Sequence, residues 1–285
     1  MSPLLHWVTE PPALRSPVLI VALEGFVDAG AVAATASMFL RHRWQSELVG
    51  RFDRDALIDY RARRPTAVVD TGHVRRVEWP DLELYAAVVD GPRDVLLLLG
   101  PEPDMAWGAF FGAVADVCRR LGVGLVLGLG AYPAAMPHTR PVRILQADNG
   151  VAGAALEGVA TITGYTGPVG AGTALQDYLK DHDFAAVGLW AEVPHYVAGS
   201  PNPTVALAMV RAVLAMLRTT VDTTELEAAA KLHREQIDGA ISEYPDAANM
   251  VSALERHVDA GGDEVDLPSG EDIAAEIERF LRQRE

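Results

Sequence analysis

The stretch VLIVALEGFVDAGAVAATASMFLRHR, residues 18–43, contains the first complete unit of the fold. Its opening residues, 18–23, are apolar and partly β-branched, and Pro17 and Gly25 bound them, which is typical of a buried strand. In residues 29–43 apolar side chains recur at helical spacing, and arginines close the segment, where the negative end of a helix favours cations. The stretch therefore predicts a strand, a turn with glycines, and a helix.

The same alternation continues along the chain. Short apolar runs predict further buried strands, and longer runs with helical spacing predict the helices between them. The strongest strands are predicted at residues 94–99, 123–129 and 185–191, and the helices at residues 107–121, 175–181 and 204–219. Apolar strands that alternate with helices favour an α/β fold, a three-layer, mainly parallel sheet with helices on both faces.

The region before residue 94 is less regular. Pro80 and Asp81 separate residues 77–79 from residues 82–89, and this pattern predicts a hairpin. Shorter strands are predicted at residues 48–52 and 67–70, and an edge strand at residues 161–163.

Composition excludes several classes of function. The chain of 285 residues carries a net charge of -15, whereas nucleic-acid binding draws on clustered Lys and Arg, so DNA and RNA are poor candidate partners. Cys118 is the single cysteine, and no Cys and His residues have the spacing of a zinc site. No apolar run reaches the ~20 residues of a membrane helix, and the first residues lack the pattern of a secretion signal. We therefore expect a cytoplasmic protein without a metal, a cofactor or a membrane segment.

The negative charge is concentrated at the C-terminal end. Residues 221–285 hold 17 Asp and Glu against 6 Lys and Arg, and their patterns predict helices only. The sequence therefore predicts two domains, an α/β core domain at residues 1–220 and an acidic helical extension at residues 221–285. The helices of the extension are predicted at residues 223–242, 246–258 and 270–282. The last of them carries an apolar stripe that must be buried on another surface, formed by Ile273, Ile277, Phe280 and Leu281.

The first candidate site is the turn after the opening strand. Gly25 and Gly30 stand where a strand ends and a helix of small residues begins, a geometry that exposes backbone amides to anions. The spacing lacks the Lys-Ser/Thr of a P-loop and differs from that of a dinucleotide-binding motif. The alternative is structural: the glycines form a tight turn, and Asp28 caps the helix.

The second candidate site is the loop TGYTGPVGAGTALQDYL, residues 163–179. Its glycines precede a helix and are able to present several amides to a ligand. A turn at the sheet edge or a contact between subunits is the alternative. The candidate binding residues of this loop are Thr166, Gly167, Gly170 and Gly172.

The third candidate site, EVPHYVAGSPNP at residues 192–203, follows a strand at the carboxyl edge of the sheet, where open α/β sheets bind ligands. Glu192 and His195 suit acid–base chemistry, and a structural histidine is the alternative. Asn202 stands before a proline and is suited to cap the next helix. No G-x-S-x-G context surrounds Ser200, and we assign no catalytic residue.

The loop PAAMPHTRP, residues 133–141, holds two further polar residues, His138 and Arg140. These side chains are able to bind an anion or a substrate. The alternative is a rigid exposed loop, of which the flanking prolines are equally typical. Cys118 lies among the apolar residues of a predicted helix, where a free cysteine behaves as a small buried hydrophobe.

Large apolar side chains near strand ends mark a candidate surface for self-association. Aromatic residues and Met are enriched at subunit contacts, and burial in the chain's own core is the alternative. On base rate a dimer is the commonest closed oligomer. The residues of this surface are Trp107, Phe110, Phe111, Tyr132 and Met136.

Four residues of the first turn, Gly25, Asp28, Ala29 and Gly30, match the G-x-x-D-A-G motif that opens the proteasome assembly chaperone type-two family. The loop TGPVGAG and the segment VPHYVAGSPNPTVALAMV are similar to the family's Gly-Pro-rich loop and to its proline-bearing entry into a long helix. The chain resembles this family over most of the predicted core. The resemblance implies a fold similar to the phosphorylase/hydrolase-like proteins, and the helical extension looks like that of actinobacterial members.

The resemblance also bears on function, and it implies no enzyme. The resemblance implies that the chain self-associates. Together with the phosphorylase-like fold, it favours a trimer over a dimer. It also adds proteasome subunits as candidate partners. Family members that assist proteasome assembly often end in a hydrophobic-Tyr-any motif. This chain ends Arg282-Gln283-Arg284-Glu285, which departs from that docking motif.

The leading hypothesis is a non-catalytic, homo-oligomeric interaction protein, a chaperone-like assembly factor. The alternative is a small-molecule enzyme or sensor in which the glycine turns hold phosphate or a nucleoside, with His195 or Glu192 nearby. The lack of a Lys or Arg near the glycine turns favours the first hypothesis. The strand-end position of His195 favours the second.

Overall fold

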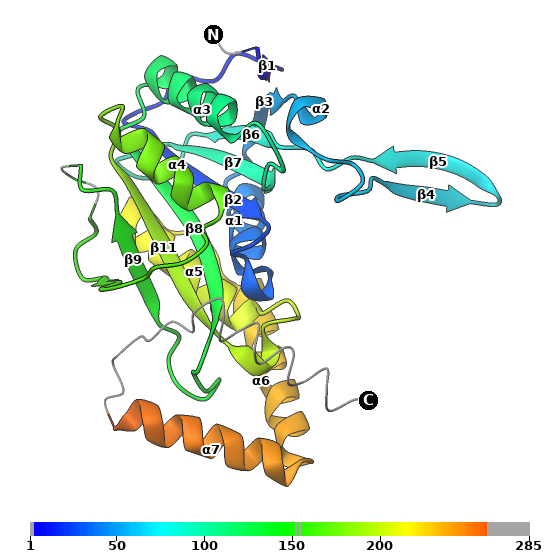
Figure 1. The fold of residues 1–285 in the computed structure, drawn as a ribbon, viewed down its shortest axis with the longest axis vertical. Coiled ribbons are helices and arrows are strands. Elements are labelled where there is room, and N and C mark those ends of the chain that lie inside the picture. The colour runs from blue at the N-terminus through cyan, green and yellow to red at the C-terminus, as the bar shows by residue number, and fades with distance from the viewer. Residues whose placement is uncertain (1–2, 152, 154, 261–285) are drawn as a thin grey trace.

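The structure is a computed structural model, and it describes residues 3–151, 153 and 155–260. One large sheet runs through the molecule. Within these residues, the strands of the sheet in spatial order are β1 (Leu5–Trp7), β3 (Glu47–Phe52), β6 (Glu83–Ala87), β7 (Val95–Pro101), β2 (Val18–Glu24), β8 (Leu125–Ala134), β11 (Ala186–Pro194), β9 (Ile144–Asp148) and β10 (Ala160–Thr161). The central strands β7, β2, β8 and β11 are parallel, as predicted, and antiparallel neighbours flank them (Figure 1).

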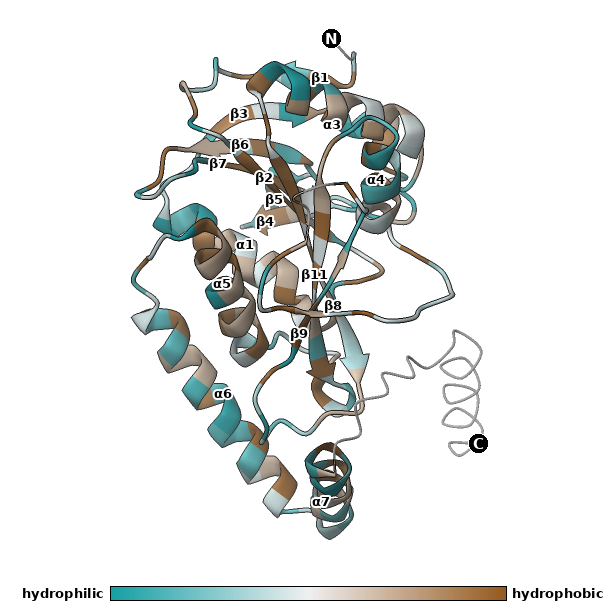
Figure 2. Ribbon diagram, turned by 90° about the vertical axis from the view of Figure 1, so that its left-hand side faces the viewer, coloured by the Kyte–Doolittle hydropathy of each residue, from teal (hydrophilic) through white to brown (hydrophobic). Residues whose placement is uncertain are grey.

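Helices cover both faces of this sheet, which confirms the predicted three layers. Figure 2 shows α1 (Val32–Arg43) and α5 (Pro203–Leu217) on one side of the central strands, and α3 (Trp107–Leu121) and α4 (Ala171–Lys180) on the other. The short helices are η1 (Ala29–Ala31), α2 (Arg54–Leu57) and η2 (His195–Val197).

Residues 18–23 of strand β2 are all apolar, in keeping with the burial of both faces of the strand. Successive side chains of a strand point to opposite faces. Ile20 therefore packs in the layer of α1 and α5, and Leu19 packs in the layer of α3 and α4. Complete burial of one such side chain stabilises the fold by about 1.5–3 kcal/mol.

The first two helices of the predicted extension are present as α6 (Thr224–Ser242) and α7 (Pro245–Asp259). Leu226 and Ala230 of α6 are buried in the same apolar cluster as α5, so α6 is joined to the core of the body. The third predicted helix, residues 270–282, lies outside the described residues. The domain boundary after residue 220 stays a prediction.

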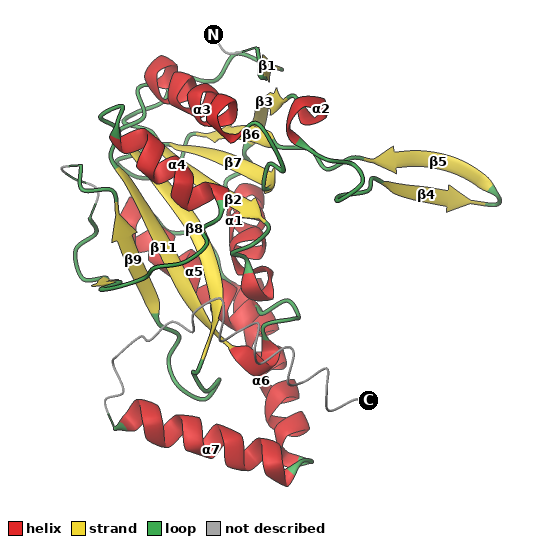
Figure 3. Ribbon diagram, in the orientation of Figure 1, coloured by secondary structure: helices red, strands yellow, loops and turns green. Residues whose placement is uncertain are grey.

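The predicted hairpin around Pro80 and Asp81 is wrong. Strand β5 (His73–Glu78) pairs with β4 (Thr66–Asp70), while β6 pairs with β3 and β7 in the large sheet. Thr71 and Gly72 form the turn between β4 and β5, and both have positive φ angles, 49° and 79°. Two-residue hairpin turns of this kind match the twist of the flanking strands. The resulting two-stranded arm projects away from the body (Figures 1 and 3).

Gly30 joins the turn after β2 to the segment after β11. Its backbone has a φ of 63°, its N–H donates to the carbonyl of Ala198 at 2.8 Å, and its carbonyl accepts from the N–H of Asn202 at 2.8 Å. A Cβ at this position would lie 3.1 Å from the Cβ of Asn202. Both the left-handed backbone and the close approach therefore require glycine.

We predict that Gly30→Ala lowers the free energy of unfolding by about 1 kcal/mol or more, because a Cβ strains the left-handed conformation. The matched control is Gly108→Ala in α3, where an added Cβ meets no atom within 4 Å. Alanine is the better helix former, so this control should be neutral or stabilising. Thermal unfolding of both variants tests the prediction, and equal melting temperatures would contradict it.

Candidate functional site

Glu102 lies at the point where the glycine turns meet. It follows β7, whose register with β2 places Glu24 beside Pro101, so the loops after both strands start side by side. One carboxylate oxygen of Glu102 accepts from the N–H of Phe26 at 3.2 Å, and the other accepts from the N–H of Ala171 at the start of α4. The carboxylate thus connects three loops that are distant in the sequence.

Two of the predicted glycines allow the backbone to approach this carboxylate. A Cβ on Gly25 would lie 2.5 Å from one oxygen of Glu102, and a Cβ on Gly170 would lie 2.9 Å from the other. The N-terminus of α4 carries partial positive charge and unpaired amides, where phosphate binds in many α/β proteins. Here the chain's own carboxylate accepts from the amide of Ala171 at this position.

Asp28 has the same role at α1. Its two carboxylate oxygens accept from the N–H groups of Ala33 at 2.7 Å and of Ala34 at 3.3 Å, so the predicted capping role is present. Burial raises the pKa of Asp28 above its ordinary value, although these amide hydrogen bonds oppose the rise. The start of α1, like that of α4, therefore binds a carboxylate of the same chain.

The other residues of the second candidate loop do not reach this point. Thr166 and Gly167 are exposed, and the hydroxyl of Tyr165 donates to the carbonyl of Pro168 at 2.6 Å. A Cβ on Gly172 would meet no atom within 4 Å. Of this loop, Gly170 alone among the predicted residues contacts Glu102 in the described structure.

The third candidate site forms a separate polar cluster. Glu192 is 4% exposed, accepts from the hydroxyl of Tyr132 at 3.1 Å, and lies 3.5 Å from the Nε of Arg143. Burial, with the Glu192 charge adding to it, raises the pKa of Tyr132 far above its ordinary value. The Oδ1 of Asn202 accepts from the N–H of Val205 at 3.1 Å and caps α5 as predicted, while His195 is exposed.

A narrow crevice of about 20 Å³, roughly the space of one water molecule, lies beside this cluster. Glu192 and Asn202 line it, together with Arg143, His138 and residues of α6. The glycines at the first and second candidate sites do not line it. The predicted site residues therefore fall in two places, the Glu102 junction and this crevice.

Burial decides what the predicted interface residues can contact. Phe110 is fully buried, and Phe111 and Met136 are 6% and 7% exposed, so their side chains pack within this chain and offer no surface to another. Trp107 and Tyr132 are half-buried.

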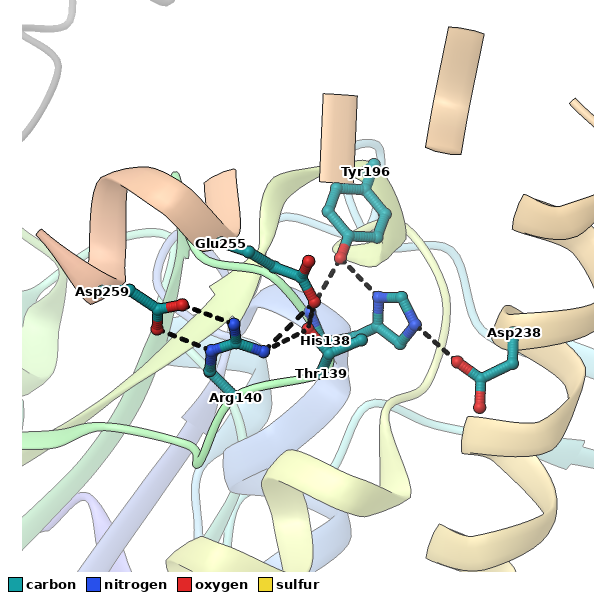
Figure 4. A network of polar contacts seen from close by, with 7 residues as sticks. All are labelled: His138, Thr139, Arg140, Tyr196, Asp238, Glu255 and Asp259. Atoms are coloured by element: carbon teal, nitrogen blue, oxygen red, sulfur yellow. Dashed lines mark hydrogen bonds and ion pairs between the residues drawn. The ribbon is translucent and has the colours of Figure 1, made fainter. Parts of the chain in front are cut away.

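Sequence reasoning identified His138 and Arg140 as anion-binding residues or parts of a rigid loop, and their anions are carboxylates of α6 and α7 (Figure 4). The hydroxyl of Tyr196 accepts from the backbone N–H of His138 at 2.8 Å and lies 2.6 Å from its Nδ1. The other ring nitrogen of His138, Nε2, lies 2.9 Å from Oδ1 of Asp238, so the ring connects Tyr196 to α6.

Arg140 holds the end of α7. It donates to both carboxylate oxygens of Asp259, at 2.8 and 2.6 Å, and to Glu255 at 3.1 Å. The hydroxyl of Thr139 donates to the same Glu255 oxygen at 2.5 Å. Paired hydrogen bonds between Arg and a carboxylate fix geometry as well as charge. We name residues 138–140, with these partners, the clamp.

Among the described residues, no group of three His, Cys, Asp or Glu side chains is placed to hold a metal ion. Within the same residues, no helix is both long and apolar enough to cross a membrane.

The fold and the site together define a class of protein, a three-layer α/β body whose helix starts and strand-end loops bind the chain's own carboxylates. The model of the PAC2 family matches residues 22–241, and the chain belongs to this family. The resemblance seen in the glycine motifs is thereby confirmed.

Solved structures agree with this assignment. A protein of unknown function from Corynebacterium glutamicum is 31% identical, with a TM-score of 0.84 over 90% of this chain and 98% of that one. A Mycobacterium tuberculosis protein of unknown function is 34% identical, with a TM-score of 0.82 over 92% of each chain. A proteasome-assembly chaperone homologue from the same organism is 34% identical, with a TM-score of 0.75 over 82% of this chain and 99% of that one. No curated protein matches.

We predict that Arg140→Ala loosens α7 and leaves the sheet intact, because it removes the hydrogen bonds to Asp259 and Glu255. Backbone amides of α7 should exchange with deuterium several-fold faster, with no change in β2 and β8. Arg256→Ala is the control, since Arg256 lies on α7 and makes no ion pair with a described residue. Equal exchange in the two variants would contradict a clamping role for Arg140.

Proposed function

We propose that this chain is a non-catalytic, homo-oligomeric interaction protein of the cytoplasm, a chaperone-like assembly factor. The observation that carries the proposal is an arm with exposed valines, near exposed apolar side chains of the strand-end loops, on a body whose candidate anion positions at α1 and α4 hold internal carboxylates.

The arm, formed by β4 and β5, has almost no buried side chain. Val69, Val74 and Val77 are 59%, 63% and 42% exposed. An isolated two-stranded hairpin is at best marginally stable in water, and its edges offer unpaired backbone groups to another chain. A partner surface that covers these valines would stabilise the arm.

The patch is our name for exposed apolar side chains on the loops near the Glu102 junction. Its members belong to the loops that Glu102 connects or to the loop that follows it, so they gather at the carboxyl edge of the sheet. Exposed apolar groups that gather in this way are characteristic of interaction sites. The patch consists of Phe26, Met105, Tyr165 and Val169, which are 64%, 44%, 49% and 42% exposed.

Arm and patch lie on connected parts of the surface. Arg63, which precedes the arm, forms an ion pair with Asp104 at 3.2 Å and donates to the carbonyl of Glu24 at 3.3 Å. The arm of one protomer can therefore reach the patch of the next in a head-to-tail contact. Head-to-tail contacts form a closed ring when the rotation between protomers closes, and the trimer that we propose is a ring of this kind.

The similarity to a proteasome-assembly chaperone homologue supports an assembly role and makes proteasome subunits the partner class to test. The alternative function, binding of a small molecule, has one candidate location, the crevice beside Glu192, which has room for little more than a water molecule. Phosphate binding at the glycine turns has weaker support, because Glu102 and Asp28 accept from amides there.

We predict that replacing Val69 and Val74 together by Asp converts the oligomer into a monomer. These residues pair across the arm and are exposed, so the change alters the contact surface and not the core. Light scattering at several concentrations should give a trimer mass for the wild type and a monomer mass for the variant. Leu232→Asp, at a 57% exposed position on α6, should keep the trimer. A wild-type monomer at every concentration, or a trimeric arm variant, would refute the proposal.

A further inference from the structure

A groove that adjoins the crevice runs between α5, α6 and the loop before β9, and the two share Pro141, Val142, Thr204 and Arg234. Its volume is about 470 Å³, and its surface is mostly apolar. Val142, Leu207, Ala208 and Ala230 supply the apolar side chains. A groove of this shape suits the apolar face of a helix.

The rim of this groove is basic in a chain of net charge -15. Arg211, Lys231 and Arg234 line it, and no Asp or Glu does. Arg211 pairs with Glu227 at 2.8 Å and Lys231 approaches Glu235 at 3.9 Å, while Arg234 makes no ion pair with a described residue. The groove therefore favours an acidic occupant.

Helix α7, after which residues 260–285 follow in the sequence, ends beside this groove. Arg140 binds Asp259, the last residue of α7, and the residues that follow Arg140 in sequence, Pro141 and Val142, form a wall of the groove. Residues 261–269 span up to about 30 Å when extended, so the sequence after them reaches the groove without any change in α7.

The sequence of residues 261–285 matches the groove in chemistry. It contains eight Asp and Glu against three Arg. Ile273, Ile277 and Phe280 recur at helical spacing, and Glu271, Asp272 and Glu276 stand between them.

We propose that this groove is the docking site for residues 270–282 of the same chain, with their apolar stripe against α5 and α6 and their carboxylates toward Lys231 and Arg234. A tethered segment has an effective concentration near the millimolar range, so a weak contact is enough to keep it bound. The inference does not depend on the proposed oligomer, because both partners belong to one chain.

Disulfide trapping in the full chain tests the proposal. Cys118 is buried, and burial raises the pKa of its thiol to about 12, so it stays inert. The test variant carries Ala208→Cys in the groove and Ile277→Cys in the tail. The matched control carries Ile277→Cys with Ala229→Cys, at an exposed position of α6 outside the groove. Mild oxidation is followed on non-reducing gels and by mass spectrometry.

We expect the test variant to form an intramolecular disulfide at least about tenfold faster than the control, as tethered docking requires. Adding Lys231→Glu and Arg234→Glu to the test variant should slow this reaction several-fold. Equal rates in test and control variants would overturn docking, and an unchanged rate after charge reversal would overturn the electrostatic part. A disulfide-linked dimer as the main product would assign the groove to the tail of a second copy and overturn docking within one chain.

Discussion

The rest of the strand-end surface depends on the hydrogen bonds that the carboxylate of Glu102 accepts. It accepts from the amides of Phe26 and Ala171, which lie 76 and 69 residues away in sequence. Such charge-assisted hydrogen bonds at a helix start are stronger than neutral ones. Because they fix the loop after β2 and the loop before α4, they also set the positions of the exposed apolar residues that we assign to the contact patch.

Internal carboxylates also occupy other polar positions of the fold. Asp28 accepts from amides at the start of α1, and Asp238, Glu255 and Asp259 bind the cationic or polar groups of the clamp. Part of the acidity of the chain is therefore structural, since it attaches the C-terminal helices to the body. Function belongs to the site and not to the fold, so these internal contacts count for more than the likeness of the fold.

Sequence patterns predicted the local features well and the long-range ones poorly. The apolar runs identified the central strands because both faces of those strands are buried, and the glycine motif identified the turn that Gly30 requires. The hairpin was misplaced because Pro80 and Asp81 are the more prominent turn signal, whereas the true turn uses Thr71 and Gly72. The role of Glu102 has no local signature, because both of its partners come from distant loops. Phe110 was assigned to a surface because composition alone does not separate a core face from a contact face.

The most direct test of this account is the melting temperature of Glu102→Ala in the presence and absence of inorganic phosphate at equal ionic strength. The account predicts that the variant melts lower than the wild type, by a loss of about 1–3 kcal/mol, because the amides of Phe26 and Ala171 lose their acceptor. It further predicts that phosphate restores part of this loss in the variant and adds no comparable stability to the wild type. A wild type that gains as much from phosphate as the variant, or a variant as stable as the wild type without phosphate, would contradict the claim that Glu102 fills this position.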